Sequence, residues 1–434
     1  MSHTSPAGSR NSNPITRTCG PNPRPRRSLL LAGMVPAIAL AVGIGCTHPG
    51  NASKGRPPLP APPLASGTAD VRELDRTLTV EEAAQYAGNS ACTPCHDAIF
   101  RQHAASAHAQ ALTPVSPQIH GKFFRLRAHV VDPLIKTVYS VRAAQDGCFM
   151  IMDGPAGHES LRADLAVGSG RAGQTYLHRA GPGEWITLRI SYYRSAHGWT
   201  FTPKQKPGEE AFAPRAGVPM DAMRTLSCLR CHTTFQVSGP DGPDLRRSLL
   251  GIGCERCHGP AQAHAQSARL LFARRQGTIA PMEDLHRAPA SRILQICGPC
   301  HSTETSPAIG DPHTEAGLPR FQATALERSR CYTRTGALSC TTCHDPHTNV
   351  STDLRAYERV CLGCHSPANT KSPTPSCPVN SATGCIRCHM PLQPIASLPG
   401  TLYHNHWIKV WQKPGQSPRS STDRSTGQVT ARAQ

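Results

Sequence analysis

The sequence has little of what fills an ordinary protein interior. Aromatic residues make up 5% of its 434 positions and hydrophobic residues 38%, whereas 36 glycines and 41 prolines interrupt helices and strands. A chain of this length has room for two or three domains, but its apolar side chains are too few for cores of the usual kind. Something other than side chains must fill the interior.

Long hydrophobic runs are also scarce, and the clearest one lies near the N-terminus. Residues 28–45 carry no charge and follow a polar start that ends in Arg26 and Arg27. This pattern predicts a signal peptide over 1–45, or alternatively a retained membrane span at the lower length limit. The sequence therefore predicts an extracytoplasmic protein, located in the periplasm if the source is a bacterium with two membranes.

Cys46 follows the uncharged run and opens a Pro-rich tether at 46–68. The end of the run, Ile-Gly-Cys, is similar to the end of a bacterial lipobox, in which the cysteine is acylated. Two interpretations stay open here: membrane attachment through acylated Cys46, or plain secretion.

Cysteine, by contrast, is abundant and regularly placed. Of the 19 cysteines, 14 fall into seven copies of the pattern Cys-x-x-Cys-His, of which chance would produce about 0.04. The seven signatures are CTPCH (92–96), CLRCH (228–232), CERCH (254–258), CGPCH (297–301), CTTCH (340–344), CLGCH (361–365) and CIRCH (385–389).

This spacing is typical of covalent haem attachment. Two cysteines three positions apart reach the two vinyl groups on one side of a porphyrin, and the next histidine coordinates the iron. A zinc ribbon does not require a histidine after every second cysteine, and a thioredoxin-like motif would occur once beside a βαβ unit. We therefore expect seven c-type haems. The predicted attachment residues are Cys92, Cys95, Cys228, Cys231, Cys254, Cys257, Cys297, Cys300, Cys340, Cys343, Cys361, Cys364, Cys385 and Cys388. The predicted proximal iron ligands are His96, His232, His258, His301, His344, His365 and His389.

The haems also account for the excess of basic residues. The formal net charge is +18, which by itself fits a nucleic-acid-binding protein. However, residues 1–45 hold five arginines and no acid, and seven haems add fourteen propionates, which together offset the excess. Much of the Arg and Lys is then expected to pair with propionates, and no nucleic-acid partner is expected.

The remaining chain divides by the density of signatures. A first haem segment spans 69–119, and residues 206–411 hold the other six signatures. Between them, FFRLRAHVV, KTVYSVR, CFMIM and EWITLRISYY are rich in β-branched and aromatic residues, which predicts an inserted, small antiparallel β-rich unit over 120–205. Helices are predicted over 70–87, with Thr79 and Glu82 as a capping box, and over 261–275. Residues 412–434 are predicted to be a disordered tail. The expected fold is mainly α and irregular, organised around covalent haems, with this insertion.

Histidine is also plentiful outside the signatures. Thirteen such histidines lie beyond the leader region, while Met is rare, so two histidines per iron is the expected ligation. Ligation of this kind favours lower potentials than His/Met ligation. His120, His129, His158, His178 and His197, in the predicted β-rich unit, are expected to be structural, whereas His286 and His313 stay open.

Residues 86–411 resemble the multihaem cytochrome c-554-like family, and in particular the haem domain of bacterial proteins that carry tetratricopeptide repeats. The segments that carry the resemblance include SACTPCHDAIFRQHAASAHAQAL, GIGCERCHGPAQAHA, SRCYTRTGALSCTTCHDPH, GCIRCHMP and HNHWI. No repeats of about 34 residues follow residue 411.

The resemblance implies that His108, His264, His347 and His406 are sixth iron ligands. His103 is an alternative to His108, because this chain has it where the family usually has an aromatic residue, and His404 is an alternative to His406. Cys331 and Cys377 lie in family-like segments and are candidates for a disulfide.

Two functions from different classes follow. The first is an electron carrier that passes electrons between redox partner proteins, and it is favoured because closely spaced haems conduct. The second is a multihaem oxidoreductase acting on nitrite, hydroxylamine or a related small nitrogen compound. Such an enzyme needs an open iron position, for example through Cys-x-x-Cys-Lys, and the sequence contains no such motif. No catalytic residue is therefore assigned.

Overall fold

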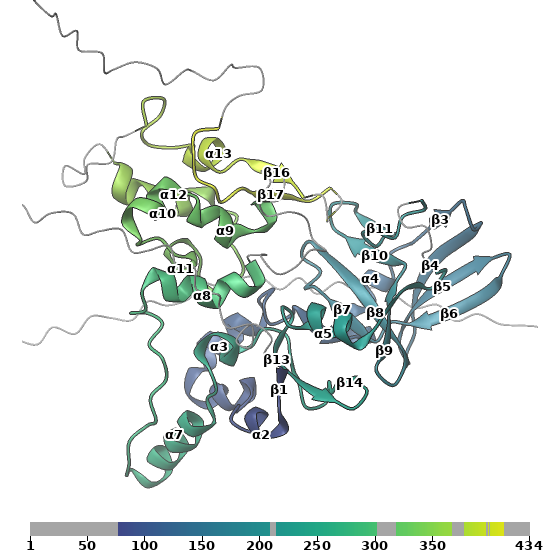
Figure 1. Cartoon of the computed structure of the whole chain (residues 1–434), viewed down its shortest axis with the longest axis horizontal. Coiled ribbons are helices and arrows are strands. Elements are labelled where there is room, and N and C mark those ends of the chain that lie inside the picture. Colours follow the sequence, from purple (N-terminus) through teal and green to yellow (C-terminus); the bar gives the residue numbers. More distant parts are fainter. Residues whose placement is uncertain are drawn as a thin grey trace, which may run out of the picture. The chain divides into compact units, whose positions relative to one another are not determined.

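The computed structural model describes residues 77–208, 214–301, 318–366, 377–395, 398 and 400–411, all of which belong to one compact unit, 61–434 (Figure 1). The predicted signal peptide, the tether with Cys46, and the predicted tail lie outside these residues. Within the described ranges, none of the helices combines the length and apolar character that a membrane span requires.

The antiparallel strands that the sequence predicted between the first and second signatures are present. Four of them pair in chain order as a meander: β3 (Val130–Asp132), β4 (Thr137–Ala143), β5 (Cys148–Gly154) and β6 (Gly157–Arg162). In β5 the side chains of Cys148, Met150 and Met152 are buried, whereas those between them are partly exposed. Alternation with period two gives the strand one core face.

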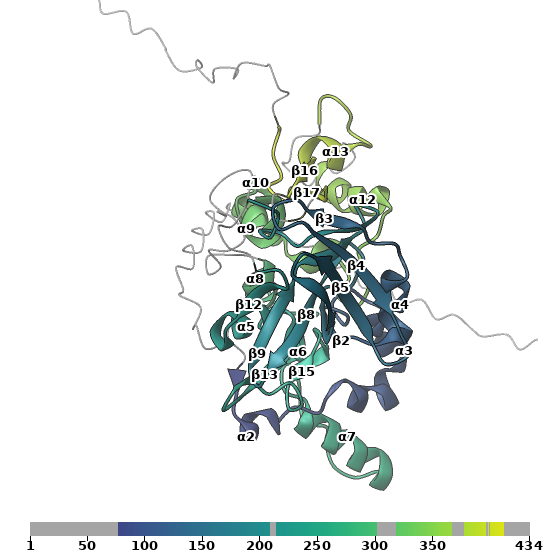
Figure 2. The same cartoon turned by 90° about the vertical axis from the view of Figure 1, so that its right-hand side faces the viewer.

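A second antiparallel sheet has seven strands, in the order β11-β10-β8-β7-β2, with β9 paired to β8 and β12 paired to β9. Its strands β8 and β9 lie side by side in Figure 2. Two of the strands, β2 and β12, come from outside residues 120–205. The strands are β2 (Leu112–Pro114), β7 (Leu165–Val167), β8 (Gly173–Gly181), β9 (Glu184–Leu188), β10 (Ile190–Tyr193), β11 (Gly198–Phe201) and β12 (Gly217–Met220).

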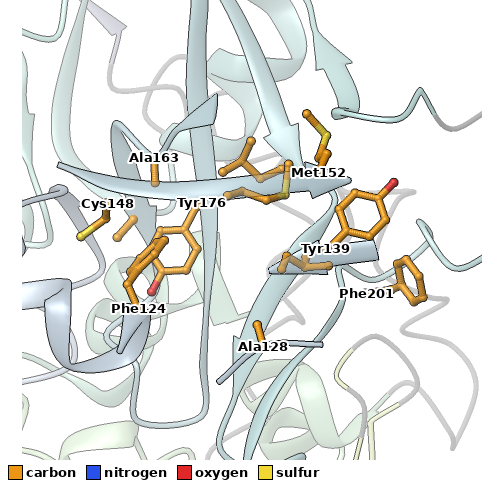
Figure 3. Close-up of a cluster of buried hydrophobic side chains, with 12 residues drawn as sticks. Phe124, Ala128, Tyr139, Cys148, Met152, Ala163, Tyr176 and Phe201 are labelled. Atoms are coloured by element: carbon orange, nitrogen blue, oxygen red, sulfur yellow. The ribbon is translucent and has the colours of Figure 1, made fainter. Parts of the chain in front are cut away.

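The largest apolar core lies between these strands (Figure 3). Its aromatic residues pack edge to face or stacked: the ring centres of Phe124 and Tyr176 are 4.8 Å apart, and those of Tyr176 and Trp199 are 5.4 Å apart. Tyr139, Met150 and Met152 extend the same cluster. The few large apolar side chains of this sequence are therefore concentrated in the β-rich part.

The prediction of a strand over FFRLRAHVV is wrong in its first half. Phe124 ends helix α4 (Pro117–Phe124), and only the last two residues of the segment, Val130 and Val131, belong to a strand. The side chain of Ser116 accepts a hydrogen bond from the backbone of Ile119 and caps the helix, and Pro117 occupies its first turn. These two helix-start signals outweigh the strand propensity of the segment.

The N-terminal helix is shorter than predicted. The capping box of Thr79 and Glu82 is present, but it starts a single turn, α2 (Val80–Ala83). Before it, β1 (Thr77–Leu78) pairs in parallel with β13 (Thr233–Gly239). Residues 77 and 78 therefore form a strand rather than a helix. Their partner strand is distant in the sequence, so local propensity does not reveal this pairing.

The remaining elements are mostly short helices, and the helix predicted over 261–275 is confirmed as α7. The helices are η1 (Asn89–Cys92), α3 (Thr93–Ala104), α5 (Ala222–Leu229), α6 (Cys254–His258), α7 (Gln262–Arg274), α8 (Ala290–His301), η2 (Leu318–Arg320), α9 (Gln322–Glu327), α10 (Arg330–Thr335), α11 (Cys340–Cys343), α12 (Leu354–His365) and α13 (Cys385–His389). The other strands are β14 (Gly242–Pro243), β15 (Leu249–Leu250), β16 (Leu392–Pro394) and β17 (Leu402–His404). The described residues thus form both helices and many strands.

A buried ion pair ties the meander to the larger sheet. Asp132, at the end of β3, accepts a hydrogen bond of 2.6 Å from the Arg189 guanidinium, and both side chains are at most 3% exposed. Its other oxygen accepts from the backbone N–H of Leu134 at 3.0 Å. We predict that Asp132→Ala lowers the free energy of unfolding of the β-rich part by about 3 to 5 kcal/mol, because it leaves a buried guanidinium without its carboxylate.

Hydrogen–deuterium exchange of the β4 and β5 amides under increasing urea measures this effect. The matched control is Asp153→Ala, since Asp153 is exposed and pairs only with a histidine at the surface. Equal protection in the two variants would contradict the prediction.

Candidate functional site

Each of the seven signatures forms a helical turn or the end of a helix. Signatures at 254, 340 and 385 begin α6, α11 and α13, while those ending at His301 and His365 close α8 and α12. In a helix, residues i and i+3 lie on one face. The two thiols of each signature are therefore presented together, as attachment to one porphyrin edge requires.

The signatures are also neighbours of one another, although they are far apart in the chain. The thiols of Cys92 and Cys254 lie within hydrogen-bonding distance, as do those of Cys231 and Cys300 and those of Cys297 and Cys340. Helix α12 contacts both α11 and α13. Groups attached to these cysteines are therefore tethered next to each other.

Three signature histidines face a histidine from outside the signatures, and each pair has the same separation. The ring centres of His301 and His108 are 6.2 Å apart, as are those of His258 and His347 and those of His344 and His406. The planes of the two rings differ by 74°, 8° and 40° in the three pairs.

This separation fits two imidazoles on opposite sides of one metal ion. A metal–imidazole bond is about 2 Å long and the ring centre lies about 1 Å beyond the nitrogen, so two such rings have centres about 6 Å apart. Direct stacking would bring them closer. Among the described residues no group of three or more His, Cys, Asp or Glu side chains could hold a bare metal ion. The histidines meet in twos, which suits an iron whose other four ligands come from a porphyrin.

The outer nitrogens of the paired rings support the same assignment. Nδ1 of His406 bonds the carbonyl oxygen of His404 at 2.9 Å, Nδ1 of His301 bonds the amide oxygen of Gln322 at 3.2 Å, and Nδ1 of His347 bonds the carboxylate of Asp345 at 3.1 Å. A hydrogen on Nδ1 leaves Nε2 with a free lone pair, which is the usual arrangement in metal-ligating histidines.

Unpaired signature histidines follow this pattern too. Nδ1 of His232 bonds the carbonyl oxygen of Ala111 at 2.9 Å, and Nδ1 of His389 bonds that of Lys409 at 3.0 Å. The rings of His96, His232 and His389 have no facing histidine within the described residues. His365 ends α12.

Burial favours the neutral form of four of the six paired imidazoles. It lowers the pKa of His406 to about 4, and it lowers the pKa values of His258, His301 and His344 from their ordinary values. Desolvation disfavours the imidazolium, and only the neutral ring can coordinate a metal.

The alternatives left open by the sequence differ in their surroundings. His108 and His406 face signature histidines, whereas Nδ1 of His404 bonds the Met390 carbonyl oxygen and His103 lines a cavity of about 360 Å³ together with His120. His264 bonds the Ala280 carbonyl oxygen and faces no signature histidine among the described residues. His313 lies outside the described residues.

In the β-rich part, three of the five histidines that were expected to be structural have polar partners. His120 bonds Thr113 and Ser116, His158 bonds Asp153, and His178 bonds the carbonyl oxygen of Arg162. Cys331 and Cys377 are both free thiols in the structure, so the disulfide suggested for them is not formed.

Two polar side chains that the sequence did not reveal position the signature segments. Buried Glu255 accepts hydrogen bonds from the backbone N–H groups of Ala87, Gly88 and Ala261 at 2.8 to 2.9 Å, which fixes the third signature to the segment before the first.

Asn349 joins two segments that carry paired histidines. Its Oδ1 accepts from the backbone N–H of Ala107 at 2.9 Å and its Nδ2 donates to the Ala105 carbonyl oxygen at 3.0 Å, across 242 positions of sequence in the first case. The turn before His108 is thereby fixed to the segment that follows His347.

A comparison with protein families matches residues 190–259 to the family described as cytochrome c554 and c-prime. The matched segment includes the signatures at 228 and 254. Over this segment the chain is similar to that family, which agrees with the resemblance of its signatures to multihaem c-type cytochromes.

Other comparisons add little detail. The fold of the chain is similar to that in the crystal structure of the outer cell wall cytochrome OcwA, with a TM-score of 0.41 and 15% sequence identity. The match covers 75% of this chain and 80% of that one. No curated protein matches it.

The side-chain amide of Asn349 provides a test of how the turn before His108 is held in place. We predict that Asn349→Ala speeds hydrogen exchange at the Ala107 amide about 30-fold, since two lost hydrogen bonds are worth about 2 kcal/mol. The low-spin ferric signal of the His108 and His301 pair should weaken in parallel.

The control is Asn380→Ala, because Asn380 accepts two backbone hydrogen bonds in an exposed turn that contacts no paired histidine. Exchange at Ala107 that is unchanged by Asn349→Ala would show that Asn349 does not hold the turn.

Proposed function

We propose that this cytochrome is an extracytoplasmic electron conduit with seven covalently attached haems. The observation that carries the proposal is the set of three histidine pairs with one common separation, 6.2 Å, each joining a signature histidine to a histidine from elsewhere in the chain. Such pairs fill both axial positions of an iron and favour electron transfer over substrate binding.

The residues that hold the haems follow from the signatures and the pairs. The cysteines of the seven signatures form the thioethers, and the seven signature histidines are the proximal ligands. His108 is the sixth ligand opposite His301, His347 opposite His258, and His406 opposite His344. His264 is proposed as a sixth ligand of one further iron, on the basis of the family resemblance alone.

When bound, each haem supplies a one-electron ferric/ferrous couple. The chain holds the imidazole ligands of that couple in fixed orientations. Bonds at Nδ1 fix the rings of His301, His347 and His406, so these ligands would not need to move between the two states. Two histidines on opposite sides also leave no position for nitrite or hydroxylamine at these three sites.

Contacts between signatures support conduction along the chain of sites. Cys92 lies beside Cys254, and Cys297 beside Cys340, so haems attached there are held as neighbours by their own thioethers. Electrons would enter from one redox partner protein and leave to another.

The proposed location rests on the sequence alone. Residues 1–45 have the pattern of a signal peptide, and covalent attachment of haem c takes place after export, in an oxidising compartment. We further propose that acylated Cys46 attaches the protein to a membrane.

Purified holoprotein tests the function directly. We predict seven haems per chain by pyridine haemochrome assay and intact mass, a ferric spectrum that is low-spin throughout, and no turnover of nitrite or hydroxylamine. The same mass measurement reports acylation at Cys46.

The oxidoreductase alternative predicts a different result. A high-spin ferric signal accompanied by turnover of either nitrogen compound would contradict the conduit. A colourless protein without Soret absorbance would contradict haem attachment altogether.

A further inference from the structure

The three histidine pairs differ in the group that accepts a hydrogen bond from the outer ring nitrogen. For His347 the acceptor is the Asp345 carboxylate, at 3.1 Å from Nδ1. For His301 it is the neutral amide oxygen of Gln322, at 3.2 Å. In the third pair, Nδ1 of His406 bonds the backbone carbonyl oxygen of His404 at 2.9 Å, whereas Nδ1 of His344 has no hydrogen-bond partner among the described residues.

An acceptor at Nδ1 changes how strongly the imidazole donates electrons to a metal. A carboxylate draws the Nδ1 proton toward itself and makes the ring more basic, an amide does so less, and a missing acceptor not at all. A more basic ligand stabilises ferric iron more than ferrous iron, which lowers the reduction potential.

We propose that Asp345 tunes the His258 and His347 site to the lowest potential of the three. The neutral acceptors, Gln322 at the His108 and His301 site and the His404 carbonyl at the His344 and His406 site, leave those two at higher values. This inference rests on the proposed function, since it takes the three pairs as iron ligands. It assigns Asp345 and Gln322 a role in setting the direction of electron flow.

The local structure holds Asp345 in place for this role. The oxygen that bonds Nδ1 also accepts the backbone N–H of His347, at 2.9 Å. The carboxylate is therefore fixed by two bonds to one residue and needs no help from a distant segment. Its side chain is 55% exposed, so water weakens its general Coulomb effect, whereas the direct hydrogen bond remains.

The ring angles allow each pair to be followed separately. In low-spin ferric haem, nearly parallel imidazoles split the iron d orbitals strongly and give a rhombic electron paramagnetic resonance spectrum, whereas nearly perpendicular ones give a single signal at large g. The 8° of His258 and His347 predicts the rhombic signal, and the 74° of His108 and His301 predicts the large-g signal.

The test is a redox titration of holoprotein with dithionite and mediators, monitored by this resonance. In Asp345→Asn we expect the rhombic signal to keep its shape and to titrate at a higher potential, with about a tenfold change in the reduced-to-oxidised ratio, or about 59 mV for one electron. In the opposite direction, Gln322→Glu should lower the potential of the large-g signal and leave the rhombic one unchanged.

The matched control is Asp353→Asn, which removes the same charge nearby. Asp353 caps α12 through the backbone of Arg355 and contacts no paired histidine. A shift in Asp345→Asn no larger than in this control would overturn the inference, as would a shift of all signals together.

Two further outcomes separate the inference from the function. If the rhombic signal is present but turns high-spin in Asp345→Asn, then Asp345 only holds His347 in position, and tuning is wrong while the ligand pair stands. If the unmodified protein lacks both signals, the ligand pairs are wrong and the inference falls with them.

Discussion

Two imidazoles can share one metal ion only if their coordinating nitrogens face each other across it, and this constraint sets the distance between the rings. The separation of 6.2 Å recurs in three pairs whose ring planes differ by 8°, 40° and 74°, so ring stacking does not produce it. The segments around 108, 347 and 406 are short, and Ile408 in the last of them packs against the cluster of Leu294, Ala323 and Leu326. Their positions depend on the histidines and on the hydrogen bonds beside them.

The distribution of apolar side chains agrees with this dependence. Phe124, Tyr139 and Tyr176 belong to a conventional core between antiparallel strands, whereas the cluster beside the signature helix α8 consists of Leu294, Ala323 and Leu326 and contains no buried aromatic residue. Around the signatures, polar groups replace apolar packing: Glu255 binds three backbone N–H groups, and Asn349 binds two backbone groups of the turn before His108. A haem face supplies the apolar surface that such a region lacks.

The sequence predicted the signatures, the antiparallel strands and α7, because each depends on local spacing or periodicity. It did not predict which signature histidine faces His108, His347 or His406, since those approaches join segments far apart in the chain. The strand predicted at Phe123 and Phe124 failed because the cap at Ser116 outweighs β propensity. The parallel pairing of Thr77 with Gln236 was hidden for a related reason: long-range pairing overrides a local helix signal.

Anomalous diffraction at the iron absorption edge, from crystals of the holoprotein, measures the shared-ion geometry most directly. An iron atom should lie midway between the rings of His258 and His347, another between those of His301 and His108, and a third between those of His344 and His406. Iron bound to these signature histidines but displaced from the second ring, with water or another residue as the sixth ligand, would contradict the account.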